Sequence, residues 1–140
     1  WGSRSDMCGI AGILHLDGRI TDDALALHAM CESLIHRGPD GQGFLVDGPV
    51  RLTMRRLSII DIDGGDQPIS NESGTIHVIL NGEIYNYKSL RNELIARKAI
   101  FVSKGDTEVL LNGWKEEGER FLHSMDANLQ DCERVVKGKG

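Results

Sequence analysis

Apolar and polar residues are spaced in a way that predicts several short strands. The run GIAGILHL is short, is followed by Asp17-Gly18, and favours a buried strand that enters a turn. Two further apolar segments flank an Asp-Gly-Pro turn, and apolar and polar residues alternate in the second of them. Two later runs are rich in β-branched residues. The predicted strands are residues 9–16, two strands within 43–60, 75–80 and 100–103.

A helical period replaces the alternation in residues 21–36, which predicts the first helix. Thr21 can cap its start, and Asp22 and Asp23 would lie in the first turn, where a negative charge favours the helix dipole. Gly38 and Pro39 are typical of a helix end. The residues expected to share its buried face are Leu27, Cys31, Leu34 and Ile35.

Two more segments predict helices, at about residues 87–97 and 107–117. Leu90, Leu94 and Ile95 fall on one face of the first, and Gly118 ends the second. Residues 62–68 predict a loop. After Asp126 the periodicity is weak, and the sequence predicts a frayed end.

Composition narrows the class of protein. The 140 residues form one domain at most, and a net charge of −5 with a pI of about 5.5 argues against nucleic acid as a main partner. No apolar stretch is long enough for a membrane span. Three widely spaced cysteines favour a reducing compartment, hence a cytoplasmic location, over a disulfide framework, and no ligand spacing indicates a metal site.

The first cysteine stands directly after a methionine, in MCGIAGI. If Met7 is the true start and is removed, Cys8 becomes the first residue, with a free α-amine beside its thiol. The amine titrates near pH ~8 and the thiol near ~8.5, so one residue can supply nucleophile and base. As written, seven residues precede Cys8, and residues 1–6 are interpreted as an extension or scar. The alternative is a small buried residue in a strand.

Four further stretches accompany this motif in a fixed order. Together the five resemble the glutaminase half of glutamine-dependent asparagine synthase, a class II glutamine amidotransferase with the N-terminal-nucleophile hydrolase fold. The resemblance covers residues 7–126 and implies an α/β fold with four αββα layers and mainly antiparallel sheets, here incomplete. The stretches are MCGIAGI at 7–13, HRGPDGQG at 36–43, RLSIID at 56–61, NGEIYNY at 81–87 and GDTEVLL at 105–111.

The resemblance implies roles for residues that react with the substrate, glutamine. Cys8 would attack the side-chain amide, form a γ-glutamyl thioester and release ammonia, with its own α-amine as base. Asn81 and Gly82 would form the oxyanion hole. Asn-Gly after a β-run is also the strongest short hairpin signal, and both interpretations can hold.

Other positions would bind glutamine. Arg56, rather than Arg55, matches the arginine that grips the α-carboxylate, and Asp106, with Glu83 nearby, matches the acidic partner of the α-ammonium group. A solvated strand arginine and a helix N-cap are the structural alternatives for Arg56 and Asp106. Apolar walls and backbone groups would come from Leu57, Ile59 and Ile60.

The chain departs from the family pattern after residue 126, so residues 127–140 are interpreted as a divergent tail. No SGGxDS-type phosphate loop occurs, so ATP and Mg²⁺ would act only in a missing synthetase domain, and the glutaminase half needs no cofactor. In the full-length enzyme the ammonia would amidate aspartate, and a homodimer is compatible with the resemblance. The alternatives are a catalytically inactive glutamine-binding fragment and a non-functional truncated product.

Overall fold

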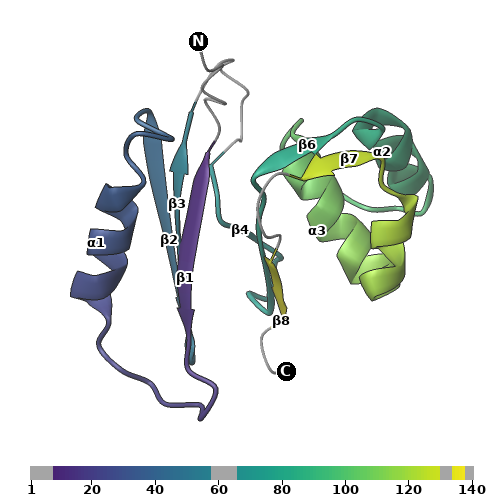
Figure 1. The fold of residues 1–140 in the computed structure, drawn as a ribbon. Helices are drawn as coiled ribbons and strands as arrows, with labels where there is room; N and C mark the ends of the chain where they lie inside the picture. The colour runs from purple at the N-terminus through teal and green to yellow at the C-terminus, as the bar shows by residue number, and fades with distance from the viewer. Residues whose placement is uncertain (1–7, 58–65, 130–133, 138–140) are drawn as a thin grey trace. The chain divides into compact units, whose positions relative to one another are not determined.

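A computed structural model describes residues 8–57, 66–129 and 134–137 of the chain. The chain divides into two compact units, residues 1–60 and 61–140, here called the N-terminal unit and the C-terminal unit (Figure 1). The predicted Ile59 and Ile60 and most of the predicted loop at 62–68 lie outside the described residues. Among the described residues, no helix has the length and apolar character that crossing a membrane requires.

The N-terminal unit is an antiparallel sheet with one helix against it. Its strands are β1 (Gly9–Leu14), β2 (Gly41–Asp47) and β3 (Val50–Arg56), in the order β1-β3-β2, and α1 (Ala24–Ser33) runs alongside the sheet (Figure 1). The His28 ring of α1 lies 4.6 Å from the Phe44 ring of β2. These three strands confirm the predictions for residues 9–16 and 43–60.

The central strand β3 is buried more completely than its alternating pattern predicts. Its polar residues Arg51, Thr53 and Arg55 are buried along with the apolar ones. The Arg51 guanidinium donates to the carbonyl oxygens of Gly48 and Thr21, at 2.6 and 2.7 Å. Buried charges need such partners, so Arg51 connects β3 to the turn at Gly48 and to the segment before α1.

The first helix begins later than its sequence predicts. Asp22 and Asp23 precede the helix instead of occupying its first turn. The Thr21 hydroxyl donates to Asp23 Oδ2 at 2.5 Å and lies 2.8 Å from His15 Nε2, so it does not cap the helix. Local side-chain bonds thus compete with helix formation. Ile35, predicted on the buried face, is also half exposed, whereas Leu27 and Cys31 are buried.

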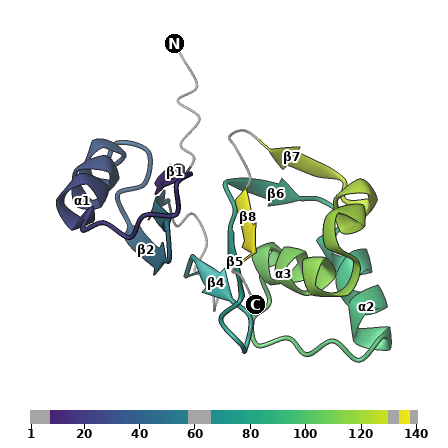
Figure 2. The ribbon, with the colours of Figure 1, turned by 90° about the horizontal axis from the view of Figure 1, so that it is seen from below.

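Among the described residues, the C-terminal unit has two antiparallel sheets and three helical segments. Figure 2 shows the helices beside the strands of this unit. One sheet has the strand order β4-β5-β8, and the other pairs β6 with β7. Helix α3 packs against β5 and α2. The elements are β4 (Ile69–Ser70), β5 (Ile76–Ile79), β6 (Gly82–Ile84), α2 (Tyr87–Ala96), α3 (Asp106–Glu117), a 3₁₀ helix (Gly118–Ser124), β7 (Ala127–Leu129) and β8 (Arg134–Lys137).

A single apolar cluster joins the elements of this unit. The predicted strand at 75–80 and the predicted helices at 87–97 and 107–117 are confirmed, and they supply most of the cluster. Ile95, predicted on the inner face of α2, is instead half exposed. The buried members are Val78, Leu80, Ile84, Leu90, Leu94, Val109, Leu110, Leu111 and Phe121.

Two predictions for this unit are wrong. Residues 100–103 form no strand: Ile100 and Val102 are exposed, and the N–H groups of Val102 and Ser103 donate to the Glu108 carboxylate, at 2.7 and 2.6 Å. The Glu108 carboxylate therefore accepts the backbone N–H groups that would otherwise pair with a neighbouring strand. The segment after Asp126 is not frayed throughout, since β7 pairs with β6 and β8 pairs with β5.

The expected fold class is confirmed. The chain is α/β, and every ladder between its named strands is antiparallel. The helices cover sheets that remain open within each unit, which agrees with an incomplete N-terminal-nucleophile hydrolase fold of the αββα type.

We expect Gly113→Ala to destabilise the C-terminal unit. A Cβ at residue 113 would lie 2.2 Å from the Phe121 ring, which is itself in the apolar cluster. Overpacking of this kind costs about 1–3 kcal/mol, which thermal or urea unfolding would detect. Glu116→Ala, on the exposed side of the same helix, is the matched control and should change stability little. Equal stability of the two variants would contradict the packing.

We also expect Asp23 to contribute to acid sensitivity. The hydrogen bond from Thr21, then that from His15, lowers the pKa of Asp23 below its ordinary value of 3.8. A lowered pKa in the folded state gives stability above the ordinary pKa, and this is lost as pH falls through the folded value. Melting temperatures between about pH 5 and 2 should therefore fall more steeply for the parent chain than for Asp23→Asn. Parallel curves would contradict this.

Candidate active site

Three of the motifs meet at one end of the β1-β3-β2 sheet. Cys8 directly precedes β1, and the register places Gly9 opposite Arg55 and Gly41 opposite Arg56. The loop before β2 lies against the end of β3, because the Asp40 N–H donates to the Arg56 carbonyl oxygen at 3.1 Å. The fold therefore brings together the start of MCGIAGI, the start of RLSIID and residues 38–41 of HRGPDGQG, here called the GPDG loop, within the N-terminal unit.

The GPDG loop is packed tightly on β3. A Cβ at Gly38 would lie 2.4 Å from backbone atoms of Arg55 and Arg56, so only glycine fits this approach. Cys8 itself is half-buried and forms no disulfide. Cys8 at the start of β1 and a loop held tightly against β3 are thus the first elements of the candidate site.

The two neighbouring arginines of β3 have different surroundings. Arg55 is 8% exposed, donates from Nε to the Cys31 carbonyl oxygen at 3.2 Å and pairs with Glu32 at 2.5 Å. It is committed to α1. Because successive side chains of a strand leave on opposite faces, Arg56 leaves β3 on the face away from that contact. Arg56 and Leu57 are half-buried.

The C-terminal unit contributes a buried amide with an unused donor. Asn81 is 1% exposed, and its Nδ2 has no hydrogen-bond partner among the residues that the structure describes. Asn81 lies between β5 and β6, and Gly82 is the first residue of β6. The two strands belong to different sheets. The hairpin suggested by the dipeptide is therefore not present between these strands.

Side chains from elsewhere fix the segment on both sides of Asn81. The Leu80 N–H donates to Gln67 Oε1 at 2.6 Å, and Gln67 Nε2 donates to Thr107 Oγ1 at 3.1 Å. The Ile84 N–H donates to Asp106 Oδ2 at 3.1 Å. Asp106 and Thr107 are the first two residues of α3, so the start of this helix holds the Asn81-Gly82 connection.

Asp106 therefore does not act as the predicted helix cap. The N-cap is Gly105, and no side chain caps the helix. Asp106 is half-buried, whereas Glu83 on β6 is exposed. Sequence reasoning missed Gln67 and Thr107, although Thr107 lies inside the GDTEVLL motif and Gln67 lies inside the predicted loop at 62–68.

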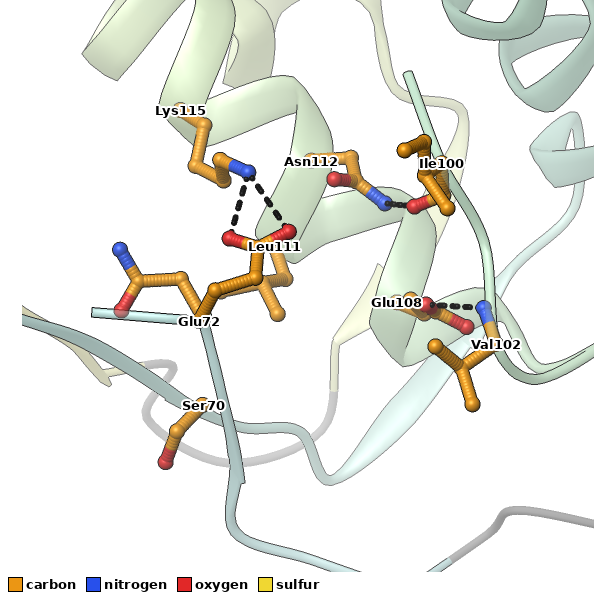
Figure 3. Close-up of a pocket in the computed structure, with 9 residues that line it drawn as sticks. Ser70, Glu72, Ile100, Val102, Glu108, Leu111, Asn112 and Lys115 are labelled. Atoms are coloured by element: carbon orange, nitrogen blue, oxygen red, sulfur yellow. Dashed lines mark hydrogen bonds and ion pairs between the residues drawn. The ribbon is translucent and has the colours of Figure 1, made fainter. Parts of the chain in front are cut away.

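A separate hollow in the same unit shares none of the predicted site residues (Figure 3). Its volume is about 130 Å³, and several of its lining residues are hydrogen-bonded to one another. Glu108 accepts the Val102 N–H, Asn112 Nδ2 donates to the Ile100 carbonyl oxygen, and Lys115 pairs with Glu72 at 2.9 Å (Figure 3). The hydrogen bond from Lys115 lowers the pKa of Glu72 below its ordinary value of 4.5. We interpret the polar residues of this hollow as structural, because their hydrogen bonds and ion pair connect neighbouring segments of the unit.

The described residues contain no group of three or more His, Cys, Asp or Glu side chains placed to hold a metal ion. The predicted site is divided between the units: Cys8, Arg56 and Leu57 belong to one, and Asn81, Gly82, Glu83 and Asp106 to the other. Within each unit the fold brings residues from separate motifs together.

Comparison with known proteins identifies the family. Residues 7–128 match the profile of the glutamine amidotransferase domain, and the chain belongs to this family. The resemblance predicted from the five motifs is confirmed.

Individual relatives are glutamine-hydrolysing asparagine synthetases. The chain is 43% identical to asparagine synthetase 1 of Bacillus subtilis over 128 residues, which are 88% of this chain and 20% of the relative. It is 39% identical to asparagine synthetase 2 of the same organism, covering 85% of this chain and 16% of the relative. A probable asparagine synthetase of Dictyostelium discoideum is 37% identical to the chain, and the match covers 88% of this chain and 22% of the relative. The chain thus spans about a fifth of the length of these relatives.

Proposed function

We propose that the chain hydrolyses the side-chain amide of glutamine to glutamate and ammonia, with Cys8 as the nucleophile. The observation that carries this proposal is the buried Asn81 Nδ2, which has no hydrogen-bond partner in the part of the chain that the structure describes. A buried donor without a partner costs about 1–3 kcal/mol, so its presence is explained if a substrate oxygen takes the bond. An oxyanion that develops during amide cleavage is such an oxygen.

The proposed reaction balances with water as the second reactant. The Cys8 thiolate adds to the amide carbon, and Asn81 Nδ2 and the Gly82 N–H donate to the resulting oxyanion. The intermediate collapses, the proton taken from the thiol goes to the leaving nitrogen, and ammonia departs to leave a γ-glutamyl thioester. Water then attacks the thioester, releases glutamate and restores the thiol.

The base in this scheme is the α-amine of Cys8. It exists only in a chain from which residues 1–7 have been removed, because an internal Cys8 nitrogen is a neutral amide. A chain that retains these residues is instead expected to bind glutamine without turnover.

Recognition of glutamine is assigned to the residues that the family resemblance implies. Arg56 is the proposed partner of the α-carboxylate, supported by the commitment of Arg55 to α1. Asp106 and Glu83 are the proposed partners of the α-ammonium group. Asp106 uses Oδ2 to hold Ile84, and its second oxygen is proposed to accept from the substrate. Apolar walls are assigned to Leu57, Ile59 and Ile60.

The relatives suggest where the ammonia goes. Their names describe glutamine-hydrolysing asparagine synthetases. We propose that a synthetase domain outside this chain uses ATP and Mg²⁺ to activate aspartate and takes the ammonia, in the cytoplasm. Glutamine hydrolysis itself is proposed to need no cofactor.

The first test uses a chain that begins at Cys8, verified by intact mass. We expect it to release ammonia from glutamine, and Cys8→Ala to abolish this release. Asn81→Ala should lower kcat by about 10²–10³, because one oxyanion donor is lost. Asn92→Ala, on the exposed side of α2, is the control and should leave kcat unchanged. Ammonia release by Cys8→Ala at the parent rate would refute the proposal.

A second test separates the two arginines of β3. Arg56→Lys should raise KM for glutamine about 10- to 100-fold, since a charge-assisted, two-pronged carboxylate contact is worth about 1.5–3 kcal/mol. Arg55→Lys should instead lower the melting temperature, because it loses the fixed contacts to Cys31 and Glu32. If Arg55→Lys gave the larger rise in KM, the assignment would be reversed.

A further inference from the structure

We propose that Gln67 is a positioning residue that aims Asn81 at the oxyanion, acting through the backbone of Leu80. This inference rests on the proposed function and extends it to a residue outside the five motifs. Gln67 does not touch the substrate in this scheme. It fixes the donor that does.

The contact geometry places Gln67 between two elements of the site. Its Oε1 accepts the Leu80 N–H at 2.6 Å, one residue before Asn81, and its Nε2 donates to Thr107 Oγ1 at 3.1 Å, in the first turn of α3. Leu80 is 3% exposed. Without Gln67, the Leu80 N–H would be a buried donor without access to water, which is energetically costly. The hydrogen bond to Gln67 therefore stabilises the backbone where the chain leaves β5.

The opposite side of the segment is tied to the same helix turn. Asp106 Oδ2 accepts the Ile84 N–H at 3.1 Å. The first two residues of α3 therefore hold the segment 80–84 at both ends, directly through Asp106 and through Gln67 from Thr107. An amide donor with no hydrogen-bond partner among the described residues, such as Asn81 Nδ2, keeps its direction only if its backbone is fixed in this way.

The chemistry explains why glutamine suits the position. One planar amide supplies an acceptor for Leu80 and a donor for Thr107. A glutamate can still accept from both, because the Thr107 hydroxyl can rotate and donate. A methionine of similar length can do neither. The variants Gln67→Glu and Gln67→Met therefore separate hydrogen bonding from packing.

The test measures glutamine hydrolysis by a chain that begins at Cys8. Gln67→Met should lower kcat about tenfold with little change in KM, because transition-state contacts are lost while ground-state contacts remain. Gln67→Glu should retain most of the kcat. Thr107→Val should shift kcat in the same direction as Gln67→Met, and Thr107→Ser should restore it.

A double variant distinguishes positioning from general structural support. In an Asn81→Ala background, Gln67→Met should change kcat less than about twofold, because its target is already gone. The same tenfold loss in both backgrounds would overturn the inference. So would a change confined to KM, or equal loss in Gln67→Glu and Gln67→Met.

A readout that needs no activity accompanies the kinetics. By NMR, Gln67→Met should speed hydrogen exchange of the Leu80 amide and shift the Asn81 side-chain amide signals, whereas Gln67→Glu should do neither. Unchanged signals in Gln67→Met would overturn the inference. A parent chain without glutaminase activity would refute the proposed function, and the catalytic role of Gln67 with it. An active parent with an unaffected Gln67→Met would refute this inference alone.

Discussion

The candidate site depends on one constraint, the fixed backbone between Leu80 and Ile84. This segment contains a buried asparagine whose amide nitrogen is unpaired among the described residues, so its direction is set by its neighbours. The first turn of α3 provides that control through Asp106 and through Thr107 with Gln67. The apolar cluster under α3, which includes Val109 and Leu110, anchors the helix. The packing of α3 therefore fixes the backbone around Asn81, and this backbone sets the direction of the Asn81 amide N–H.

The strand β3 has the comparable role in the N-terminal unit. It is the central strand, and its two last residues face different ways. Arg55 stabilises the contact with α1, whereas Arg56 ends the strand beside the GPDG loop. Two adjacent residues of the same type thus have different tasks, and alternation along a strand is the reason. The register with β1 also places the start of MCGIAGI at this end of the sheet.

Sequence reasoning predicted the strands and helices that are defined by the local spacing of their apolar residues, such as β1, β5 and α3. It failed where a distant or polar side chain decides the conformation. Residues 100–103 look like a strand, but the Glu108 carboxylate takes their N–H groups. The start of α1 was misplaced because Thr21 bonds to Asp23 rather than to the helix. The tail after residue 126 lacks periodicity, yet β6 and β5 provide edges with which it pairs.

The same distinction applies to the site. The motifs themselves predicted the family and the residues proposed to act on glutamine, since those residues are set by chemistry. Gln67 could not be found in this way, because its importance comes from a hydrogen bond across 13 residues and another across 40. The pattern of apolar and polar residues along the chain does not show such contacts, because only the folded backbone brings the bonded residues together.

The most direct measurement is the intact mass of a chain that begins at Cys8, quenched with acid while it turns over glutamine. The account predicts a fraction of chains heavier by glutamine minus ammonia, with the added group on Cys8 and released by hydroxylamine, as expected for a thioester. Ammonia production without this adduct, or an adduct on another residue, would contradict it.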